Sequence, residues 1–436
     1  MTLPRYPEYR ASGVEWIGEV PAHWEPRRLG RRIDLATGFA FPSAGFTQDT
    51  SGIRLLRGTN VTPSGISWDD VVYWRRSPVD GLDHLELSIG DVVLGMDRPL
   101  ISDGVRVALV TESDTPALLL QRVARIRPSG SLFSRFIFLL LSSKLFAGYI
   151  TPIFTGVSVP HLSPEQIRAF YIPVPPLPEQ HAIVAYLDRK TARIDDLIEK
   201  KRRLLALLKE RRTAIITHTV TKGLPADEAR AAGLPVDPPM KDSGVEWLGK
   251  VPGHWSVGQL RQVMSMKSGL AITSDNISET GYYPVYGGNG IRGYTDRHTH
   301  DGQFVLIGRQ GALCGNVHFV NGQFWASEHA VAVTVGRNLV PRFSYYLLGE
   351  MNLNQYSVAA AQPGLAVNRV LALLGVLPPP AEQHAIVAYL DRETARIDEL
   401  TAKVEEAIEL LGEYRTALIT AAVTGQVDAR GAVEAW

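Results

Sequence analysis

Two stretches of the sequence place an arginine at a turn between apolar runs. Gly302 to Val320 reads GQFVLIGRQGALCGNVHFV, with Arg309 and Gln310 at the turn. Gly90 to Val107 reads GDVVLGMDRPLISDGVRV, with Arg98 at the turn. In the major groove of DNA, arginine pairs bidentately with guanine, and glutamine pairs with adenine. These turns are therefore candidates for contacts to base edges.

A polar stretch lies upstream of each turn. Residues 286–300 read YGGNGIRGYTDRHTH, and residues 54–60 read RLLRGTN. With the turns, these stretches give the candidate DNA-binding residues Arg54, Arg57, Asn60, Arg98, Asn289, Arg292, Arg297, His298, Arg309 and Gln310. The alternative for each is an ordinary hairpin whose polar side chain is solvated, and the sequence leaves both interpretations open.

Patterns that resemble catalytic motifs are incomplete. Residues 244–251, GVEWLGKV, nearly match a phosphate-binding loop, but Val251 stands where Ser or Thr must hold magnesium, and the first copy has Glu19 in place of the lysine. Residues 237–240, DPPM, resemble the DPPY tetrapeptide of adenine methyltransferases, but Met240 lacks the ring that stacks on a flipped base. We therefore predict no catalytic residues, no metal site and a chain that is not an enzyme.

Composition is that of a soluble globular protein, with 436 residues, 45% hydrophobic and 21% charged. The N-terminus lacks the apolar segment of a secretory signal, and the apolar run 136–141 is too short to span a bilayer, so we expect a cytoplasmic protein without membrane contact. The single cysteine, Cys314, cannot form an internal disulfide. A net charge of zero disfavours coating nucleic acid by charge alone but allows local basic patches.

The sequence is an imperfect duplication. Residues 12–29, SGVEWIGEVPAHWEPRRL, match residues 243–260, SGVEWLGKVPGHWSVGQL, at 11 of 18 positions. Residues 179–197, EQHAIVAYLDRKTARIDDL, match residues 382–400, EQHAIVAYLDRETARIDEL, at 17 of 19 positions. Such repeats indicate that one supersecondary unit occurs twice.

The borders of the repeat are similar while its interior is not. The opening block recurs after 231 residues and the helix block after 203, so the second interior is 28 residues shorter. A duplicated enzyme with one decayed copy would have lost its borders as well. A constant frame around different contents therefore favours one scaffold that presents two different binding surfaces.

Each helix block begins a long predicted helix. The stretch from Glu179 to about Thr217 contains no Gly or Pro, follows a proline-rich approach, and is closed by Gly223. In the second copy Gly412 is expected to interrupt the helix late, and Gly425 to end it. About 40 residues at roughly 1.5 Å per residue give a helix near 60 Å long.

Apolar spacings of three and four predict a seam between the two helices. The interface residues are Leu187, Ile194, Ile198, Leu205, Leu208, Leu390, Ile397, Val404, Ile408 and Leu411. Residues 179–223 carry a net charge of +5 and residues 382–425 a net charge of −5. Opposite charges favour pairing of the two helices over two solvated helices with independent roles. Because each helix follows its own globular unit, a pseudo-twofold arrangement would make them antiparallel.

These observations predict an α+β fold with two globular mixed α/β domains, two long antiparallel helices and a pseudo-twofold repeat. The predicted segments are a first globular domain (1–178), a central helix (179–222), a linker (223–242), a second globular domain (243–380), a distal helix (381–425) and a tail (426–436).

The whole pattern resembles the specificity (S) subunits of type I restriction–modification systems. The two EQHAIVAYLD blocks after PVPPLPEQ and LPPPAEQ resemble the central and distal conserved regions of that family. The paired SGVEWxGxVPxHW blocks resemble the starts of its two target-recognition domains, and HLSPEQIRAFYIPVPPLPEQ at 161–180 resembles its approach to the central helix.

The resemblance implies that each globular domain reads one half of a split site in double-stranded DNA, with the helices as spacer. It also implies two methyltransferase (M) subunits as partners, and restriction (R) subunits in a full endonuclease. S-adenosylmethionine, ATP and magnesium would belong to those partners, with no cofactor in this chain. Two alternatives stay open: a protein–protein scaffold without sequence-specific DNA contacts, and a self-sufficient methyltransferase, for which no cofactor motif is found.

Overall fold

The structure is a computed structural model that describes residues 4–76, 81–101, 104–154, 160–311, 314–357 and 364–430. It divides into two compact units. Unit 1 comprises Met1–Arg202 and Glu406–Trp436, and unit 2 comprises Arg203–Glu405. Each of the long helices α4 (Leu177–Lys222) and α8 (Pro380–Val423) is divided between the two units, with one part in each. The compact units therefore cut across both helices, and the predicted segment boundaries stay predictions.

Unit 1 is built on two small sheets. The four-stranded sheet has the order β12-β9-β14-β4, from β4 (Ile33–Thr37), β9 (Val92–Gly95), β12 (Val107–Leu109) and β14 (Val123–Pro128), all antiparallel to their neighbours. The three-stranded sheet contains β5 (Ile53–Leu56), β8 (Tyr73–Trp74) and β13 (Ala117–Leu119), with β13 parallel to β5. Short pairs complete the strands: β1 (Tyr9–Ala11) with β2 (Glu19–Pro21), β3 (Glu25–Arg28) with β15 (Tyr171–Val174), β6 (Val61–Thr62) with β7 (Gly65–Ile66), and β10 (Leu100–Ile101) with β11 (Gly104–Val105).

Helices cover one face of the four-stranded sheet of unit 1. Helix α1 (Ser134–Leu141) buries Phe136, Ile137 and three leucines in a core shared with β9, β14, α2 (Lys144–Ile150) and parts of α4 and α8. Helix α3 (Pro164–Ala169) begins with Ser163, whose side chain accepts from the Gln166 backbone N–H while Gln166 reaches back to the Ser163 N–H. This capping box and the proline at the first helical position fix where α3 starts.

Unit 2 contains one six-stranded sheet of order β19-β24-β22-β23-β20-β21. Its strands are β19 (Met264–Ser268), β20 (Tyr283–Gly287), β21 (Gly290–Thr295), β22 (His300–Gly308), β23 (Val317–Ala326) and β24 (Ala330–Val335). The main core lies between this sheet, α6 (Pro341–Glu350) and residues of α4 and α8. The remaining elements are α5 (Ala226–Ala231), α7 (Val367–Leu371), β16 (Met240–Asp242) with β17 (Lys250–Pro252), and β18 (Ser256–Gln259) with β25 (Leu374–Leu377).

The same strand order occurs in both units. The order β12-β9-β14-β4 in unit 1 corresponds to β23-β22-β24-β19 in unit 2, with antiparallel pairing at every step. The parallel pair of β5 and β13 corresponds to β20 and the end of β23. The predicted mixed α/β fold and internal repeat are thus confirmed, although the interiors of the two copies differ in sequence.

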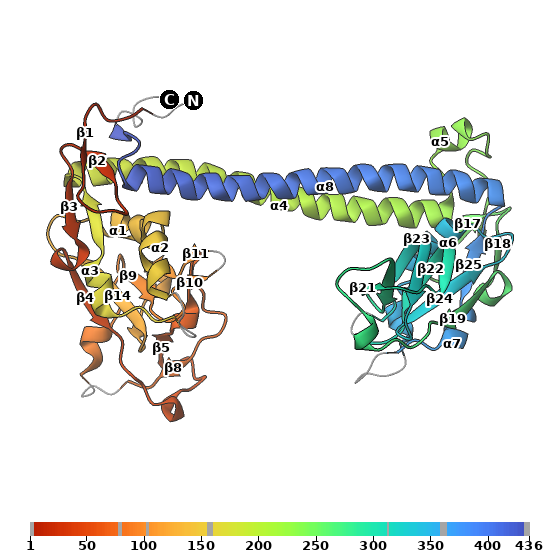
Figure 1. Cartoon of the computed structure of the whole chain (residues 1–436), viewed down its shortest axis with the longest axis horizontal. Coiled ribbons are helices and arrows are strands. Elements are labelled where there is room, and N and C mark those ends of the chain that lie inside the picture. The colour runs from red at the N-terminus through yellow and green to blue at the C-terminus, as the bar shows by residue number, and fades with distance from the viewer. Residues whose placement is uncertain are drawn as a thin grey trace. The chain divides into compact units, whose positions relative to one another are not determined.

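The long helices lie side by side (Figure 1), and inside each unit apolar residues of both helices belong to one core. In unit 1, Asp195 on α4 accepts from Arg415 on α8 at 2.8 Å, and in unit 2 Arg212 on α4 donates to Asp398 on α8 at 3.0 Å. As residue numbers increase along α4, the numbers of the neighbouring α8 residues decrease. The two helices are therefore antiparallel. All ten predicted seam residues are buried or half-buried.

The expected interruption of the second helix at Gly412 is wrong. Helix α8 continues without a break from Pro380 to Val423. A single glycine in a helix costs about 1 kcal/mol relative to alanine, which packing of the remaining turns can offset.

A buried glutamate joins the opening block of each unit to its long helix. Glu179 accepts a hydrogen bond from the indole N–H of Trp24 at 3.1 Å, and its second oxygen lies 2.8 Å from Nε2 of His23. In unit 2, Glu382 lies 2.8 Å from Nε2 of His254. Because a buried carboxylate is costly without hydrogen bonds, these partners fix each opening block against its helix start.

The next residue of each helix block is a fully buried glutamine. Gln180 accepts from the backbone N–H of Phe133, just before α1, at 2.9 Å, and it donates to the carbonyls of Ser131 and Pro175. Gln383 makes the matching bonds in unit 2, to Val340, Asn338 and Pro378. The near-identity of the two helix blocks therefore reflects the same set of buried polar contacts made twice.

Among the described residues, no single helix combines the length and apolar character needed to cross a membrane. A bent pair, Ser134–Leu141 with Lys144–Phe154, meets those criteria only jointly.

The first prediction concerns a close backbone approach that is repeated in the two units. A Cβ added at Gly38 would lie 2.1 Å from the carbonyl oxygen of Leu120, and one at Gly269 would lie 2.2 Å from that of Ala326. We expect Gly38→Ala to lower the free energy of unfolding by about 1–3 kcal/mol, because the close approach of Gly38 to the backbone of Leu119 and Leu120, at the end of β13, must open. Thermal and urea unfolding measure the change.

Gly412→Ala is the matched control, since a Cβ at Gly412 meets nothing within 4 Å. It should raise the unfolding free energy by about 0.5–1 kcal/mol. Equal stability of the two variants would contradict the close approach at Gly38.

Candidate nucleic-acid interface

Loops between the strands gather at one edge of the sheet in each unit. We call residues 57–60, 96–98, 104–106 and 121–122 the loop edge of unit 1. The corresponding loop edge of unit 2 comprises residues 287–290, 309–311, 314–316 and 328–329. Both edges carry polar side chains on a rigid sheet, which is the arrangement in which loops carry binding function.

Backbone hydrogen bonds show that the two loop edges correspond residue by residue. Gly95 N–H donates to Arg106 O at 2.8 Å, and Gly308 N–H donates to Asn316 O at 2.8 Å. These two bonds close the connection between β9 and β12 in unit 1 and the connection between β22 and β23 in unit 2. Arg106 and Asn316 therefore occupy equivalent positions.

Two further bonds extend the correspondence. Met96 N–H donates to Arg122 O at 2.9 Å, as Arg309 N–H does to His329 O. Isolated bridges then pair Asp97 with His161 in unit 1 and Gln310 with Gly364 in unit 2. Asp97 is thus equivalent to Gln310, and Arg98 is equivalent to Gly311.

The arginines at the two turns quoted from the sequence therefore occupy different positions, because Arg98 is equivalent to Gly311 and not to Arg309 or Gln310. Arg98 has a φ of 44° and Gly311 a φ of 86°, so both adopt the left-handed conformation. A non-glycine residue there costs roughly 1–2 kcal/mol, and such strain concentrates at functional sites. Arg98 is exposed, and among the described residues its side chain has no polar partner.

The other three candidates in unit 1 make contacts within the unit. Arg54 donates to the Ser113 carbonyl at 2.9 Å and stacks 4.5 Å from the Trp68 ring. Arg57 forms an ion pair with Asp70 at 2.7 Å. Asn60 is 3% exposed, and its amide donates to the carbonyls of Ser67 and Asp70. Because Asn60 is buried and hydrogen-bonded, we leave it out of the interface proposed below.

Three candidates in unit 2 lie on its loop edge. Asn289 is exposed and accepts from the Asn316 amide at 2.9 Å. Gln310 is exposed, and Arg309 is half-buried with its backbone carbonyl accepting from Leu365 N–H. The structure therefore brings the two stretches proposed from sequence, 286–300 and 302–320, together at this edge.

The remaining candidates follow β20 and β21. Arg292 lies over Gly287, because a Cβ there would be 2.4 Å from Arg292 Cδ. Arg297 and His298 are exposed in the loop after β21, and the His298 ring lies 4.8 Å from that of Tyr283. Arg292 thus borders the loop edge, whereas for Arg297 and His298 no hydrogen bond or ion pair to the edge is found among the described residues.

Sequence reasoning missed five edge residues: Asp97, Arg106, Arg122, Asn316 and His329. Arg106 and Asn316 stand inside the two stretches quoted as hairpins, but only the hydrogen-bond pattern shows that each lies directly before the returning strand. Arg122 has a left-handed φ of 64°, and nothing in its neighbouring sequence marks it. Only the folded structure relates it to His329.

An ion pair organises the loop edge of unit 1. Asp97 Oδ2 accepts from Arg122 at 2.8 Å, and its Oδ1 lies 2.7 Å from Nδ1 of His161. Burial acts to raise the pKa of Asp97, but the hydrogen bonds from His161 and Arg122 outweigh it and lower the pKa below its usual value. Asp97 is therefore a carboxylate at neutral pH, with Arg122 held beside it.

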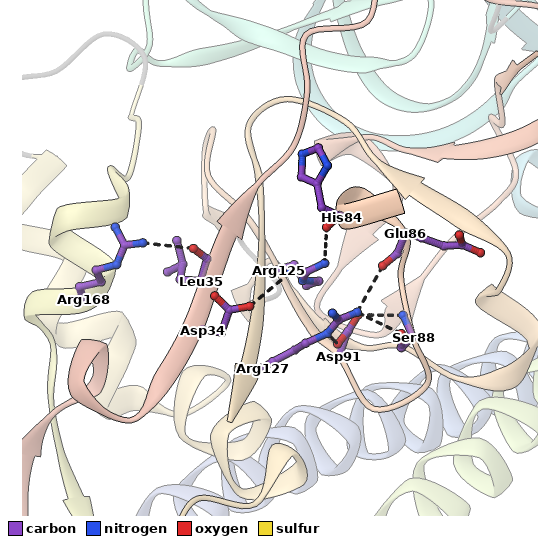
Figure 2. A network of polar contacts seen from close by, with 9 residues as sticks. All are labelled: Asp34, Leu35, His84, Glu86, Ser88, Asp91, Arg125, Arg127 and Arg168. Carbon is purple, nitrogen blue, oxygen red and sulfur yellow. Dashed lines mark hydrogen bonds and ion pairs between the residues drawn. The ribbon is translucent and has the colours of Figure 1, made fainter. Parts of the chain in front are cut away.

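Arg125 and Arg127 of unit 1 make contacts that stabilise the sheet, as Figure 2 shows. Arg125 is 5% exposed and donates to the His84 carbonyl at 2.7 Å, with Asp34 at 3.4 Å. Arg127 forms an ion pair with the buried Asp91 and also donates to Ser88. These two side chains hold the segment before β9 against β14, so we exclude them from the interface.

No group of three or more His, Cys, Asp or Glu among the described residues is arranged to hold a metal ion.

Comparison with protein families gives one match in two parts. The model described as "Type I restriction modification DNA specificity domain" matches residues 87–206 and 252–410. The chain is 45% identical over 151 residues to the Escherichia coli type I restriction enzyme EcoprrI specificity subunit, which covers 34% of this chain and 37% of that one. It is 34% identical over 192 residues to the EcoAI specificity subunit, covering 44% and 31%. These alignments thus span about a third of the curated relatives.

Longer but weaker similarity covers nearly the whole chain. The EcoKI specificity subunit of Escherichia coli K12 is 20% identical over 454 residues, covering 96% of this chain and 92% of that one. Among solved structures, a chain from "Structural basis underlying complex assembly and conformational transition of the type I R-M system" aligns with a TM-score of 0.66 at 19% identity, covering 93% and 98%. The HsdS subunit from Thermoanaerobacter tengcongensis aligns with a TM-score of 0.51 at 18% identity, covering 94% and 98%. Similarity at this level concerns the fold.

The second prediction follows from the lowered pKa of Asp97. Its ionised form stabilises unit 1 at pH values above about 3.9, the ordinary aspartate pKa, and this contribution is lost as the pH falls through the lower pKa of the folded state. We expect Asp97→Asn to reduce stability at neutral pH and to flatten the decline in unfolding free energy between about pH 5 and pH 2. Urea unfolding across that range measures the slope.

Asp275→Asn, at an exposed position of unit 2, controls for the loss of one negative charge. An unchanged slope in Asp97→Asn would show that the contacts to Arg122 and His161 do not stabilise the carboxylate.

Proposed function

Because the chain belongs to the type I restriction modification DNA specificity family, we propose that it reads a two-part target in double-stranded DNA, with one half-site for each unit. The observation that carries this proposal is the pair of loop edges, which share a hydrogen-bonded backbone but differ in side chains. Equivalent backbones present each edge in the same way, while different side chains select different bases. Members of this family are not enzymes themselves, in agreement with the sequence prediction.

The candidates that support this reading are the polar residues at or beside the edges. The exposed ones are Arg98 in unit 1 and Asn289, Arg292 and Gln310 in unit 2, and Arg309 is half-buried between them; Arg297 and His298 are exposed in the loop after β21. Arg54 and Arg57 contribute to the interface indirectly, because their contacts within unit 1 hold its loops in place. The chain has no net charge, so phosphate contacts would come in part from partner subunits.

We further propose that the long helices bind the partner subunits. Apolar side chains are exposed on the helix faces away from the seam. In unit 1 these are Leu197 (47% exposed), Leu410 (57%) and Tyr414 (55%), and in unit 2 Leu204 (42%), Leu207 (60%) and Leu400 (43%). Exposed apolar residues gathered on helices are typical of surfaces that a protein partner covers. Two methyltransferase subunits, and restriction subunits in a full endonuclease, would supply the cofactors and the chemistry, in the cytoplasm.

The third prediction tests the half-site assignment. The full chain is produced with its methyltransferase partner, and the methylated adenines are mapped by methylation-sensitive sequencing. Replacing residues 1–178 with the matching region of another specificity subunit should change one half of the target and leave the other half unchanged. The reason is that the loop edge of unit 1 lies within the exchanged residues while that of unit 2 does not.

The original chain with the same partner is the reference for this exchange. Methylation without sequence preference by the original complex would favour the protein–protein scaffold. Binding of S-adenosylmethionine by the isolated chain would favour a self-sufficient methyltransferase. Either result would contradict the proposed function.

A further inference from the structure

Arg106 of unit 1 has one buried guanidinium nitrogen without a hydrogen-bond partner among the described residues. Its side chain is half-buried, and the buried nitrogen is Nε. Neighbouring Arg122 differs, because Asp97 neutralises it at 2.8 Å. A buried donor without an acceptor costs free energy, so the position favours a ligand that supplies acceptors.

The surroundings of Arg106 form a pocket of about 460 Å³ at the loop edge. Charged side chains Arg57, Asp97, Arg106 and Arg122 line it together with Phe41 and Phe46. The Asp97 carboxylate lies in the same pocket, where Arg122 already balances its charge. It can still accept from an amino group, since each carboxylate oxygen has more than one acceptor site. Because Arg57 is paired with Asp70 and Arg122 with Asp97, the groups left for a ligand are the Arg106 guanidinium and the remaining acceptor sites of Asp97, and this donor–acceptor pair fits a base edge.

The chemistry of this pair matches one base pair. Arginine donates bidentately to O6 and N7 of guanine, and aspartate accepts from N4 of cytosine. Arg106 with Asp97 thus has the hydrogen-bonding groups for a G·C pair.

The equivalent residue of unit 2 has different chemistry in the same backbone setting. One Asn316 amide hydrogen is donated to Asn289 Oδ1 at 2.9 Å. That contact leaves the Asn316 oxygen as an acceptor and the Asn289 amide as a donor, and both residues are exposed. One acceptor and one donor side by side match N6 and N7 of adenine.

We propose that Arg106 and Asn316 are base-specificity residues at equivalent positions of the two units. Arg106, with Asp97, selects a G·C pair in the half-site of unit 1. Asn316, with Asn289, selects an A·T pair in the half-site of unit 2. This assignment rests on the proposed function and adds to it the residues and the base classes.

The test uses the full chain with its methyltransferase partner and maps methylation over a whole genome. Arg106→Ala should relax one G·C position in one half-site, with discrimination falling about 10- to 100-fold. Asn316→Ala should relax one A·T position in the other half-site by a similar factor. Arg106→Lys should also relax the G·C position, because lysine keeps the charge but cannot reproduce the planar fork.

Matched controls lie on the same units away from the edges. Arg27 is an exposed arginine paired with Glu25 on β3, and Gln323 is an exposed amide paired with Asp301 on β23. Arg27→Ala and Gln323→Ala should leave both half-sites unchanged. Melting temperature and co-purification with the partner are measured for every variant, and Arg106→Lys and Asn316→Gln replace any alanine variant that does not fold.

The outcomes separate this assignment from the proposed function. Methylation by the original complex without sequence preference would overturn both. A two-part target that all variants keep unchanged would overturn the assignment alone. So would a uniform loss of methylation with unchanged base preference, which identifies a phosphate contact, or full guanine preference in Arg106→Lys, which shows that charge alone suffices.

Discussion

The buried Glu–Gln pair at the start of each long helix is the contact on which the organisation of both units depends. Glu179 is 7% exposed and Gln180 is completely buried, and Glu382 and Gln383 are alike. The glutamate binds the opening block, and the glutamine binds the chain just before α1 in unit 1 and just before α6 in unit 2. Replacing either residue would leave buried polar groups without partners, which is more costly than losing an exposed contact. This requirement explains why the helix blocks remain almost identical while the interiors differ.

Because the strand pairing is the same in both units, the side chains at the loop edges can differ between them. Strand pairing at the edges uses backbone groups, such as those of Gly95 and Gly308, and these bonds are the same whatever side chains follow. Arg106 and Asn316 can therefore differ without altering the turn that carries them. Changing a side chain at the loop edge has a small effect on the free energy of unfolding, whereas changing one in the core or in the buried Glu–Gln pair has a large effect.

The sequence predicted the fold well because its strongest signals are local. Identical blocks, proline-rich approaches and a long stretch free of glycine and proline before Gly223 all concern neighbouring residues. The candidate interface was predicted only in part. Asn289, Gln310 and Arg309 were found because glycine-rich turns mark them, whereas Asn60 proved to be buried and hydrogen-bonded. Arg122 and His329 could not be found, because their place at the edge depends on strand pairing between distant segments. The predicted interruption at Gly412 was wrong because packing along the whole helix, and not the helix propensity of one residue, decides whether a long helix continues.

The division of the chain has a consequence for the order of folding. Unit 2 is one continuous segment, 203–405, whereas unit 1 needs residues 406–436 in addition to the first 202. Ala422, Val423 and Ala429, near the end of the chain, are completely buried in unit 1. During synthesis, the ribosome therefore releases all of unit 2 before the last piece of the unit 1 core exists. Although domains usually fold in order from the N-terminus, we therefore expect unit 2 to complete its core before unit 1 does.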